Sequence, residues 1–218
     1  MKGVRASSAA SIGEIMRVSP VIPVLTLHDP SEARGIARAL VSGGLRVLEV
    51  TLRTPAALEI IEALRDIDGA IVGAGTVLNA SQLDDAISAG AEFAVSPGLT
   101  EPLAARASSR DFPYLPGVAT AGDIMRGLDL GLSHFKFFPA ETSGGIPTLK
   151  ALSAPFANVR FCPTGGVSEA TAPSWLALPQ VLCVGGSWLV PSGPPDLNSI
   201  EAAARRAASF KPNSGGAA

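Results

Sequence analysis

Eight short apolar runs recur along this chain at nearly constant spacing, and this feature limits the possible folds more than any other. Each run is rich in β-branched or other apolar residues, as expected for a buried strand. The runs are Val21–Leu27, Leu45–Leu52, Ala70–Val77, Glu92–Pro97, Tyr114–Ala119, His134–Ala140, Val159–Gly166 and Val181–Ser187. Between them, apolar residues recur at intervals of three and four, which is typical of helices. The chain therefore alternates strands with helices.

This alternation favours parallel pairing, because parallel strands need a long crossover connection. Eight such units predict a single-domain (β/α)₈ barrel over residues 1–210, although an open doubly wound sheet also fits the pattern. The length of 218 residues lies at the short end of the range for such barrels. We expect an N-terminal helix beginning at Ser11, and disorder in the polar, glycine-rich tail 211–218.

The composition argues against nucleic acid and membrane as partners. The net charge is −2, and Lys and Arg are dispersed rather than gathered into a basic surface. The stretch 170–195 has no charge, but prolines and glycines interrupt it. Cys162 and Cys183 lie in apolar runs, and the N-terminus lacks the order of a secretory signal, so we expect buried thiols and a cytoplasmic protein. No spacing resembles a metal cage, and no cofactor is expected.

Charged residues inside two of the apolar runs are the candidates for chemistry. Side chains alternate along a strand, so Glu49 and Arg53 share one face of their run and Leu48 and Val50 the other. The apolar face should pack against helices, which directs Glu49 and Arg53 into the barrel. Lys136 is the only one of four lysines set inside an apolar run. In such barrels the active site forms where the strands end.

Each of these three charges has both a catalytic and a structural interpretation. Lys136 is either paired with a carboxylate or kept neutral as a nucleophile, because burying an ammonium group is expensive. Glu49 is suited to moving a hydroxyl proton in a dry site, or it merely neutralises Lys136 or Arg53. Arg53 can hold a carboxylate through two parallel hydrogen bonds, or it forms a salt bridge at the rim. His134, at the start of its run, is expected at the barrel floor.

Two glycine pairs follow the last two expected strands. They are Gly165-Gly166 and Gly185-Gly186, and the second pair is followed by Ser187. Glycine lets backbone N–H groups approach an anion, and barrel enzymes frequently bind phosphate after strands seven and eight. The pairs therefore indicate a phosphate site, with tight turns as the alternative.

Longer strings around these residues are specific enough to identify a family. They are Gly-Gly-Leu-Arg-Val-Leu-Glu-Val-Thr-Leu-Arg-Thr (43–54), Val-Gly-Ala-Gly-Thr-Val-Leu (72–78), Ser-Pro-Gly (96–98), Phe-Lys-Phe-Phe-Pro-Ala-Glu (135–141), Arg-Phe-Cys-Pro-Thr-Gly-Gly (160–166) and Gly-Gly-Ser-Trp-Leu-Val (185–190). Together they closely resemble the 2-keto-3-deoxy-6-phosphogluconate aldolase family. The resemblance extends from about Ile12 to Pro191.

The resemblance implies a role for each candidate residue. Lys136 would form the Schiff base, and Glu49 would accept a proton. The pyruvate part of the substrate would lie among Arg53, Thr76, Pro97 and Phe138. The phosphate would be held by Gly165, Gly166, Gly186 and Ser187.

The resemblance also implies a homotrimer and a place in the Entner–Doudoroff pathway. The expected reaction is cleavage of 2-dehydro-3-deoxy-6-phosphogluconate to pyruvate and glyceraldehyde 3-phosphate. The galactonate-derived epimer and 4-hydroxy-2-oxoglutarate are alternative substrates that need the same imine. A non-catalytic sugar-phosphate sensor on the same fold remains an alternative, because fold does not fix function. A sensor would need neither Lys136 nor Glu49.

Overall fold

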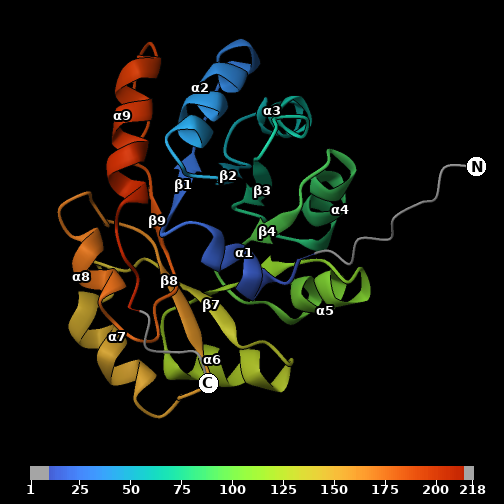
Figure 1. Cartoon of the computed structure of the whole chain (residues 1–218). Coiled ribbons are helices and arrows are strands. Elements are labelled where there is room, and N and C mark those ends of the chain that lie inside the picture. The colour runs from blue at the N-terminus through green and yellow to red at the C-terminus, as the bar shows by residue number, and fades with distance from the viewer. Residues whose placement is uncertain (1–9, 214–218) are drawn as a thin grey trace, which may run out of the picture.

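The computed structural model describes residues 10–213 as an α/β protein whose paired strands all run parallel (Figure 1). The strands are β1 Val21–Leu25, β2 Val47–Thr51, β3 Ile71–Gly75, β4 Phe93–Val95, β5 Tyr114–Leu115, β6 Gly117–Val118, β7 His134–Phe137, β8 Arg160–Pro163 and β9 Val184–Gly186. The helices are α1 Ile12–Val18, α2 Pro30–Ser42, α3 Ala57–Leu64, α4 Ala80–Ser88, α5 Glu101–Ser109, α6 Ala121–Asp129, α7 Gly145–Ser153, α8 Ala172–Leu176 and α9 Leu197–Ala208. The expected alternation is therefore confirmed.

The strands form two curled sheets rather than one continuous eight-stranded barrel. One sheet has the order β5-β4-β3-β2-β1-β9, and the other has the order β6-β7-β8. The expected strand 114–119 is divided at Pro116, which has no N–H to donate to a neighbouring strand. Between β8 and β9 only two isolated bridges occur, Phe161 with Val181 and Thr164 with Gly185. The last strand lies beside the first, which an open doubly wound sheet would not produce.

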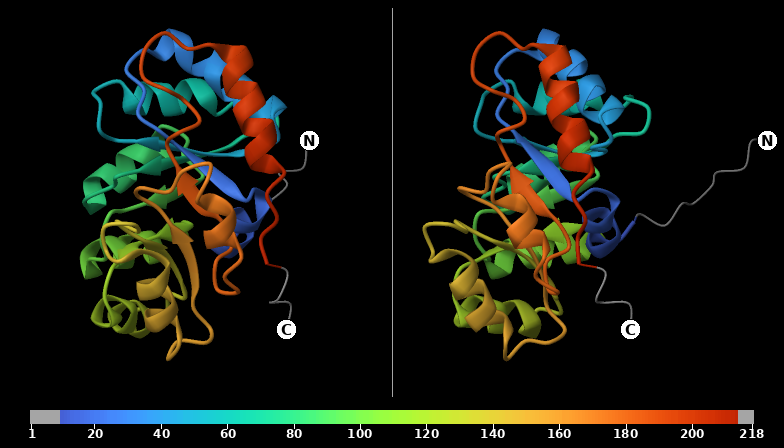
Figure 2. Two further views of the ribbon diagram at one scale, coloured as in Figure 1. Left: turned by 90° about the vertical axis from the view of Figure 1, so that its left-hand side faces the viewer. Right: turned by 60° about the vertical axis from the view of Figure 1, so that its left-hand side comes forward.

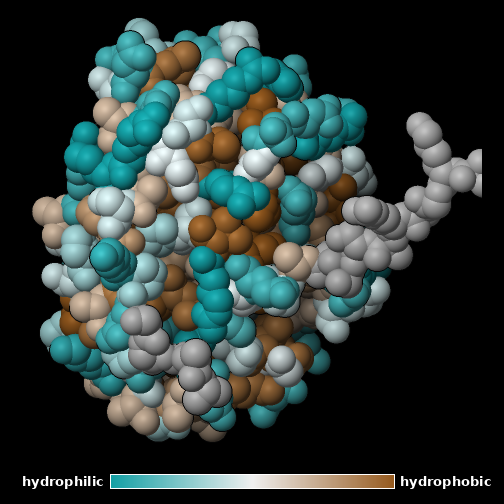
Figure 3. All heavy atoms as spheres, in the orientation of Figure 1, coloured by the Kyte–Doolittle hydropathy of each residue, from teal (hydrophilic) through white to brown (hydrophobic). Residues whose placement is uncertain are grey.

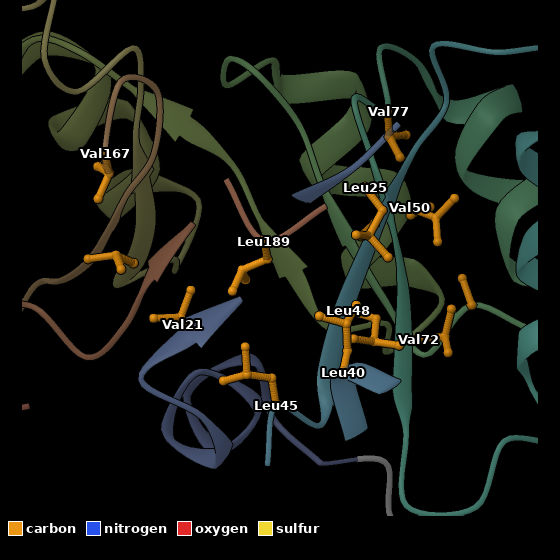
Figure 4. Packing of buried hydrophobic residues seen from close by; sticks show 14 of the residues in the cluster. Val21, Leu25, Leu40, Leu45, Leu48, Val50, Val72, Val77, Val167 and Leu189 are labelled. Atoms are coloured by element: carbon orange, nitrogen blue, oxygen red, sulfur yellow. The ribbon is translucent and has the colours of Figure 1, made fainter. Parts of the chain in front are cut away.

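The two faces of β2 enter two different cores, as the alternation of side chains predicts. Leu48 and Val50 belong to an outer core, where the strands pack against the surrounding helices (Figure 4). Val47, which lies on the same face of β2 as Glu49, belongs to an inner core that also contains Phe93 and Cys162. The other views place α2 to α9 outside the strands (Figure 2). The expected inward direction of Glu49 is therefore confirmed.

Helix α1 closes the end of the molecule at which the strands begin. Ser11 and Glu14 form a reciprocal capping box that satisfies backbone N–H groups at the start of the helix. Ile15 and Met16 are buried in the inner core beside Val47. On this face, apolar residues gather near the centre and hydrophilic side chains cover the surrounding helices (Figure 3). Since α1 fills this end, a ligand has access from the opposite end.

The ends of the chain bear on two further expectations. The expected N-terminal helix is confirmed, and it begins one residue after Ser11. Most of the expected disordered tail, 214–218, lies outside the described residues. In its described part, Asn213 donates hydrogen bonds from its backbone and side chain to the carbonyl groups of Leu176 and Ala177.

The helices within residues 10–213 are all too short or too polar to span a membrane.

His134 lies at the floor of the molecule, as its place at the start of a strand predicts. A Cβ atom on Gly13 of α1 would be only 2.7 Å from its Nε2 atom, so the ring packs directly under the helix. Its Nδ1 atom is 3.1 Å from the Ser133 hydroxyl. Burial lowers the pKa of His134, and the positive charges of Arg17 and Arg160 lower it further.

The lowered pKa of His134 predicts that acid weakens the fold. Below the ordinary pKa of about 6.5, the unfolded chain binds a proton that the folded chain resists, so the free energy of unfolding falls as pH falls. Urea unfolding between pH 5 and 8, at fixed protein concentration, should show a flatter dependence in His134→Gln. His28→Gln, which changes the exposed second histidine, should keep the wild-type slope. Equal slopes in all three proteins would contradict this assignment.

Candidate active site

A pocket of about 160 Å³ lies at the C-terminal ends of the strands. Nine of the ten candidate residues line it, although they come from separate parts of the chain. These nine are Glu49, Arg53, Thr76, Pro97, Lys136, Phe138, Gly165, Gly166 and Ser187. The strand ends therefore bring together almost all the residues that the sequence analysis selected.

A buried ion pair forms the base of this pocket. The Nζ atom of Lys136 is 3.1 Å from Oε1 of Glu49, and the two side chains are only 7% and 4% exposed. Gly75 makes room for the carboxylate, because a Cβ atom there would lie 2.3 Å from Oε1 of Glu49. The structure thus pairs Glu49 with Lys136 rather than with Arg53.

The position of Lys136 is fixed by its strand and by the aromatic ring beside it. In β7 it pairs with Gly117 on one side and Cys162 on the other. Its backbone N–H donates to the carbonyl of Pro116 at 2.8 Å. Its Nζ atom is 5.2 Å from the centre of the Phe138 ring, a distance at which a ring face attracts a cation. The lysine is therefore held between a carboxylate and an aromatic face.

Arg53 is free to bind a ligand. It follows β2 and is exposed at the wall of the pocket. No acidic side chain within residues 10–213 lies within salt-bridge distance of its guanidinium group. The alternative of a rim salt bridge therefore has no support, and an anionic group of a substrate can take the position opposite Arg53.

Thr76 has a strained backbone at the edge of the pocket. Its φ angle is +58°, in the left-handed region that β-branched residues rarely adopt. Such a conformation costs roughly 1–3 kcal/mol and persists only where surrounding contacts hold it. The next residue, Val77, donates its backbone N–H to the carbonyl of Val95 at 3.0 Å. The strain marks this position as one that the fold maintains.

The loop of the first glycine pair packs tightly against the residues after β7. Gly165 and Gly166 have φ angles of +98° and +82°, which glycine adopts without strain. A Cβ atom on Gly165 would lie 3.3 Å from the Phe138 ring, and one on Gly166 would lie 2.7 Å from side-chain atoms of Glu141. The Glu141 carboxylate in turn accepts a hydrogen bond from Trp175 at 3.0 Å. The loop therefore needs glycine for close packing as well as for any contact with a ligand.

Gly186 is the one candidate that does not line the pocket. It is buried in β9, where a Cβ atom would overlap the ring of Trp188. Its neighbour Gly185 lines the pocket instead, against Thr164. The sequence of the second glycine pair alone does not reveal which of its two glycines lines the pocket.

Three threonines of the pocket were not selected by the sequence analysis. Thr26, Thr51 and Thr164 all line it. Thr51 lies on the same strand face as Glu49 and Arg53, so the alternation of side chains could have indicated it. Thr164 directly precedes the first glycine pair, which could have indicated it as well. Thr26 follows β1 and had no charged or glycine-rich neighbour in the sequence to mark it.

The fold and the pocket define the class of protein. It is a parallel α/β protein that presents a buried lysine and carboxylate at the ends of its strands, next to an exposed arginine and a glycine-rich loop. Within residues 10–213, no cluster of three or more histidine, cysteine or acidic side chains is arranged to hold a metal ion.

Comparison with known proteins identifies the family. The model of the family described as KDPG and KHG aldolase matches residues 12–203, so this chain belongs to that family. A 2-dehydro-3-deoxy-phosphogluconate aldolase of Zymomonas mobilis is 57% identical over 200 residues, which is 92% of this chain and 96% of that protein. A KHG/KDPG aldolase of Escherichia coli is 52% identical over 183 residues, which is 84% and 86% of the two chains.

Solved structures agree with this membership. A crystal structure of the Zymomonas mobilis 2-keto-3-deoxy-6-phosphogluconate aldolase with 3-phosphoglycerate superimposes with a TM-score of 0.92 at 56% identity, covering 93% of this chain and 97% of that one. The KDPG aldolase of Legionella pneumophila, with pyruvate captured at low pH as a covalent carbinolamine intermediate, has a TM-score of 0.89 at 43% identity. The superposition covers 92% of this chain and 99% of the Legionella pneumophila chain.

Proposed function

We propose that this protein is a Schiff-base aldolase that cleaves 2-dehydro-3-deoxy-6-phosphogluconate to pyruvate and glyceraldehyde 3-phosphate. The observation that carries the proposal is the lysine buried in the pocket 3.1 Å from a carboxylate, in a chain of the KDPG and KHG aldolase family. The carbinolamine of the Legionella pneumophila relative supports covalent chemistry with pyruvate.

The first half of the reaction makes the imine. Glu49 is close enough to take a proton from the Lys136 ammonium group, which leaves a neutral amine to attack the C2 ketone of the substrate. Glu49 then returns this proton to the hydroxyl of the carbinolamine, which leaves as water. The product is an imine with a positive nitrogen, and Glu49 is again a carboxylate. This nitrogen is the electron sink for the bond that breaks next.

The second half cleaves the substrate. Glu49, directly or through a water molecule, takes the proton of the C4 hydroxyl as the C3–C4 bond breaks. The bonding electrons move into the imine and leave an enamine, while C4 becomes the aldehyde of glyceraldehyde 3-phosphate. Protonation of the enamine at C3 and hydrolysis of the imine then release pyruvate and free Lys136.

The remaining pocket residues bind the two ends of the substrate. Arg53 holds the substrate carboxylate, and Thr76, Pro97 and Phe138 enclose the pyruvate part. The phosphate lies against Gly165, Gly166, Gly185 and Ser187, and 3-phosphoglycerate in the Zymomonas mobilis relative supports a phosphate-bearing ligand. The same imine chemistry serves 4-hydroxy-2-oxoglutarate, the second substrate that we propose, and would also serve the galactonate-derived epimer.

The architecture and the assembly are part of the proposal. We propose that the two sheets act as one closed (β/α)₈ barrel in a single domain, since one residue separates β5 from β6 and two bridges join β8 to β9. A homotrimer and a cytoplasmic location remain predictions from the family resemblance and the composition.

Lys136 gives the decisive test. Incubation with pyruvate and borohydride should inactivate the protein, because hydride reduction turns a reversible imine into a stable amine. Peptide mapping should place the label on Lys136, since Lys150 is exposed to water and does not line the pocket. Lys136→Arg should abolish the label and the cleavage, because guanidinium forms no imine. Retained aldolase activity in that variant would reject the Schiff base and favour a metal-dependent enzyme, and a protein without label or activity would favour a sensor.

Glu49 is expected to act in cleavage more than in imine formation. Glu49→Gln keeps the size of the side chain but loses the proton acceptor, so cleavage should slow by roughly 10²-fold or more. Borohydride trapping with pyruvate should still label Lys136. Circular dichroism should confirm that the variant is folded. Near-normal turnover would assign the proton transfers to another group.

The phosphate site predicts a difference between the two substrates. Ser187→Ala, or a bulky residue in place of Gly166, should lower kcat/KM for the phosphorylated substrate far more than for 4-hydroxy-2-oxoglutarate, which has no phosphate. Ser187 is the cleaner position, because its side chain is exposed while any side chain at Gly166 would meet Glu141. Equal losses on both substrates would mean that these residues serve the fold alone.

A further inference from the structure

Two threonine hydroxyls lie side by side in the pocket, one layer above the catalytic pair. Val24 pairs with Glu49 in the register of β1 and β2, and Thr26 and Thr51 each follow two residues later. Their Oγ1 atoms are 2.9 Å apart. Thr51 is buried, whereas Thr26 is exposed at the pocket. The proposed mechanism uses neither hydroxyl.

The hydrogen bonds determine which way the Thr26 hydroxyl points. The Thr51 hydroxyl is 3.1 Å from the carbonyl oxygen of Leu25, which can only accept. A hydroxyl has one proton, so Thr51 donates it to Leu25, and the short contact between the threonines needs Thr26 as its donor. The Thr26 oxygen then has only lone pairs to offer to the pocket. It can accept a hydrogen bond from a ligand hydroxyl but cannot donate one to a carboxylate or phosphate.

Thr26 also lies in the wall that the pocket shares with a second cavity. This cavity of about 540 Å³ adjoins the pocket, and the two share Val24, Thr26 and Ser187 in their walls. A substrate that reaches from Glu49 at its C4 hydroxyl to Ser187 at its phosphate has C5 in between. A substrate bound in this way would bring its C5 group to the wall that contains Thr26.

We propose that Thr26 is a specificity-determining residue whose hydroxyl oxygen accepts a hydrogen bond from the substrate C5 hydroxyl. The inference rests on the proposed function, because it needs Lys136 and Glu49 to place C2 and C4. It predicts a preference between substrates, since 4-hydroxy-2-oxoglutarate has a carboxylate carbon at C5 and no proton there to donate. Thr26 then favours the polyhydroxylated, phosphorylated substrate over the dicarboxylate.

The test uses the reverse reaction, in which the aldehyde supplies C4 to C6. Pyruvate is combined with glyceraldehyde 3-phosphate, or with 3-oxopropyl phosphate, which keeps the phosphate and lacks only the hydroxyl that becomes the C5 hydroxyl. The measured quantity is the ratio of kcat/KM for the two aldehydes. Thr26→Val, which keeps the shape but removes the acceptor, should reduce this ratio about three- to tenfold, the range of one neutral hydrogen bond.

Two matched variants separate recognition from folding. Thr26→Ser keeps the acceptor and should keep a ratio close to that of the wild type. Thr54→Val removes a hydroxyl that donates to the carbonyl of Leu27 at 2.7 Å but does not line the pocket, so it should leave the ratio unchanged. If Thr26→Val does not fold, Thr26→Ala gives the same comparison.

The outcomes distinguish this inference from the proposed function. An unchanged ratio in Thr26→Val, or an equal loss in Thr54→Val, would overturn the role of Thr26 while the aldol reaction itself stands. Failure of the wild type to make an aldol product from either aldehyde would overturn the proposed function and the role of Thr26 with it.

Discussion

The contact between Lys136 and Glu49 is the interaction on which the rest of the structure depends. Two charged groups are taken out of water here, and removing one partner from such a buried pair typically costs about 3–5 kcal/mol. The pair is tolerated because each partner has a neighbour shaped for it. Gly75 leaves space for the carboxylate, and the Phe138 ring faces the ammonium group. The fold therefore maintains a reactive pair that a purely apolar core would not contain.

The inward faces of the strands carry apolar packing residues at one end and the polar residues of the pocket at the other. Near the start of the strands, the inward side chains of Val47 and Ile22 form an apolar layer, and Met16 of α1 covers it. Further along, the inward positions become Glu49 and Thr51, which line the pocket. The outward face is apolar throughout and holds the helices. Because the floor is packed, polar groups at the open end can be arranged for binding without leaving the strands unsupported.

The rigidity of the pocket rim comes from close contacts between loops. Thr76 keeps an unfavourable backbone angle, Gly165 adopts a conformation that favours glycine, and Gly166 sits too near Glu141 to carry a side chain. Glu141 links this glycine loop to Trp175 of α8 through a hydrogen bond. Loops held in this way keep binding groups in place before a ligand arrives, which reduces the ordering that binding would otherwise require.

The sequence by itself determined the strands, their two faces and the unusual position of Lys136, because apolar periodicity and the scarcity of buried charge are local properties. It did not determine that Glu49 pairs with Lys136 and leaves Arg53 without an acidic partner. Lys136 and Glu49 are 87 residues apart, and only strand register brings them together. The placement of Gly185 rather than Gly186 in the pocket and the contact of Thr26 with Thr51 have the same cause. Each depends on which side chains of neighbouring strands share a layer, and tertiary packing alone decides that.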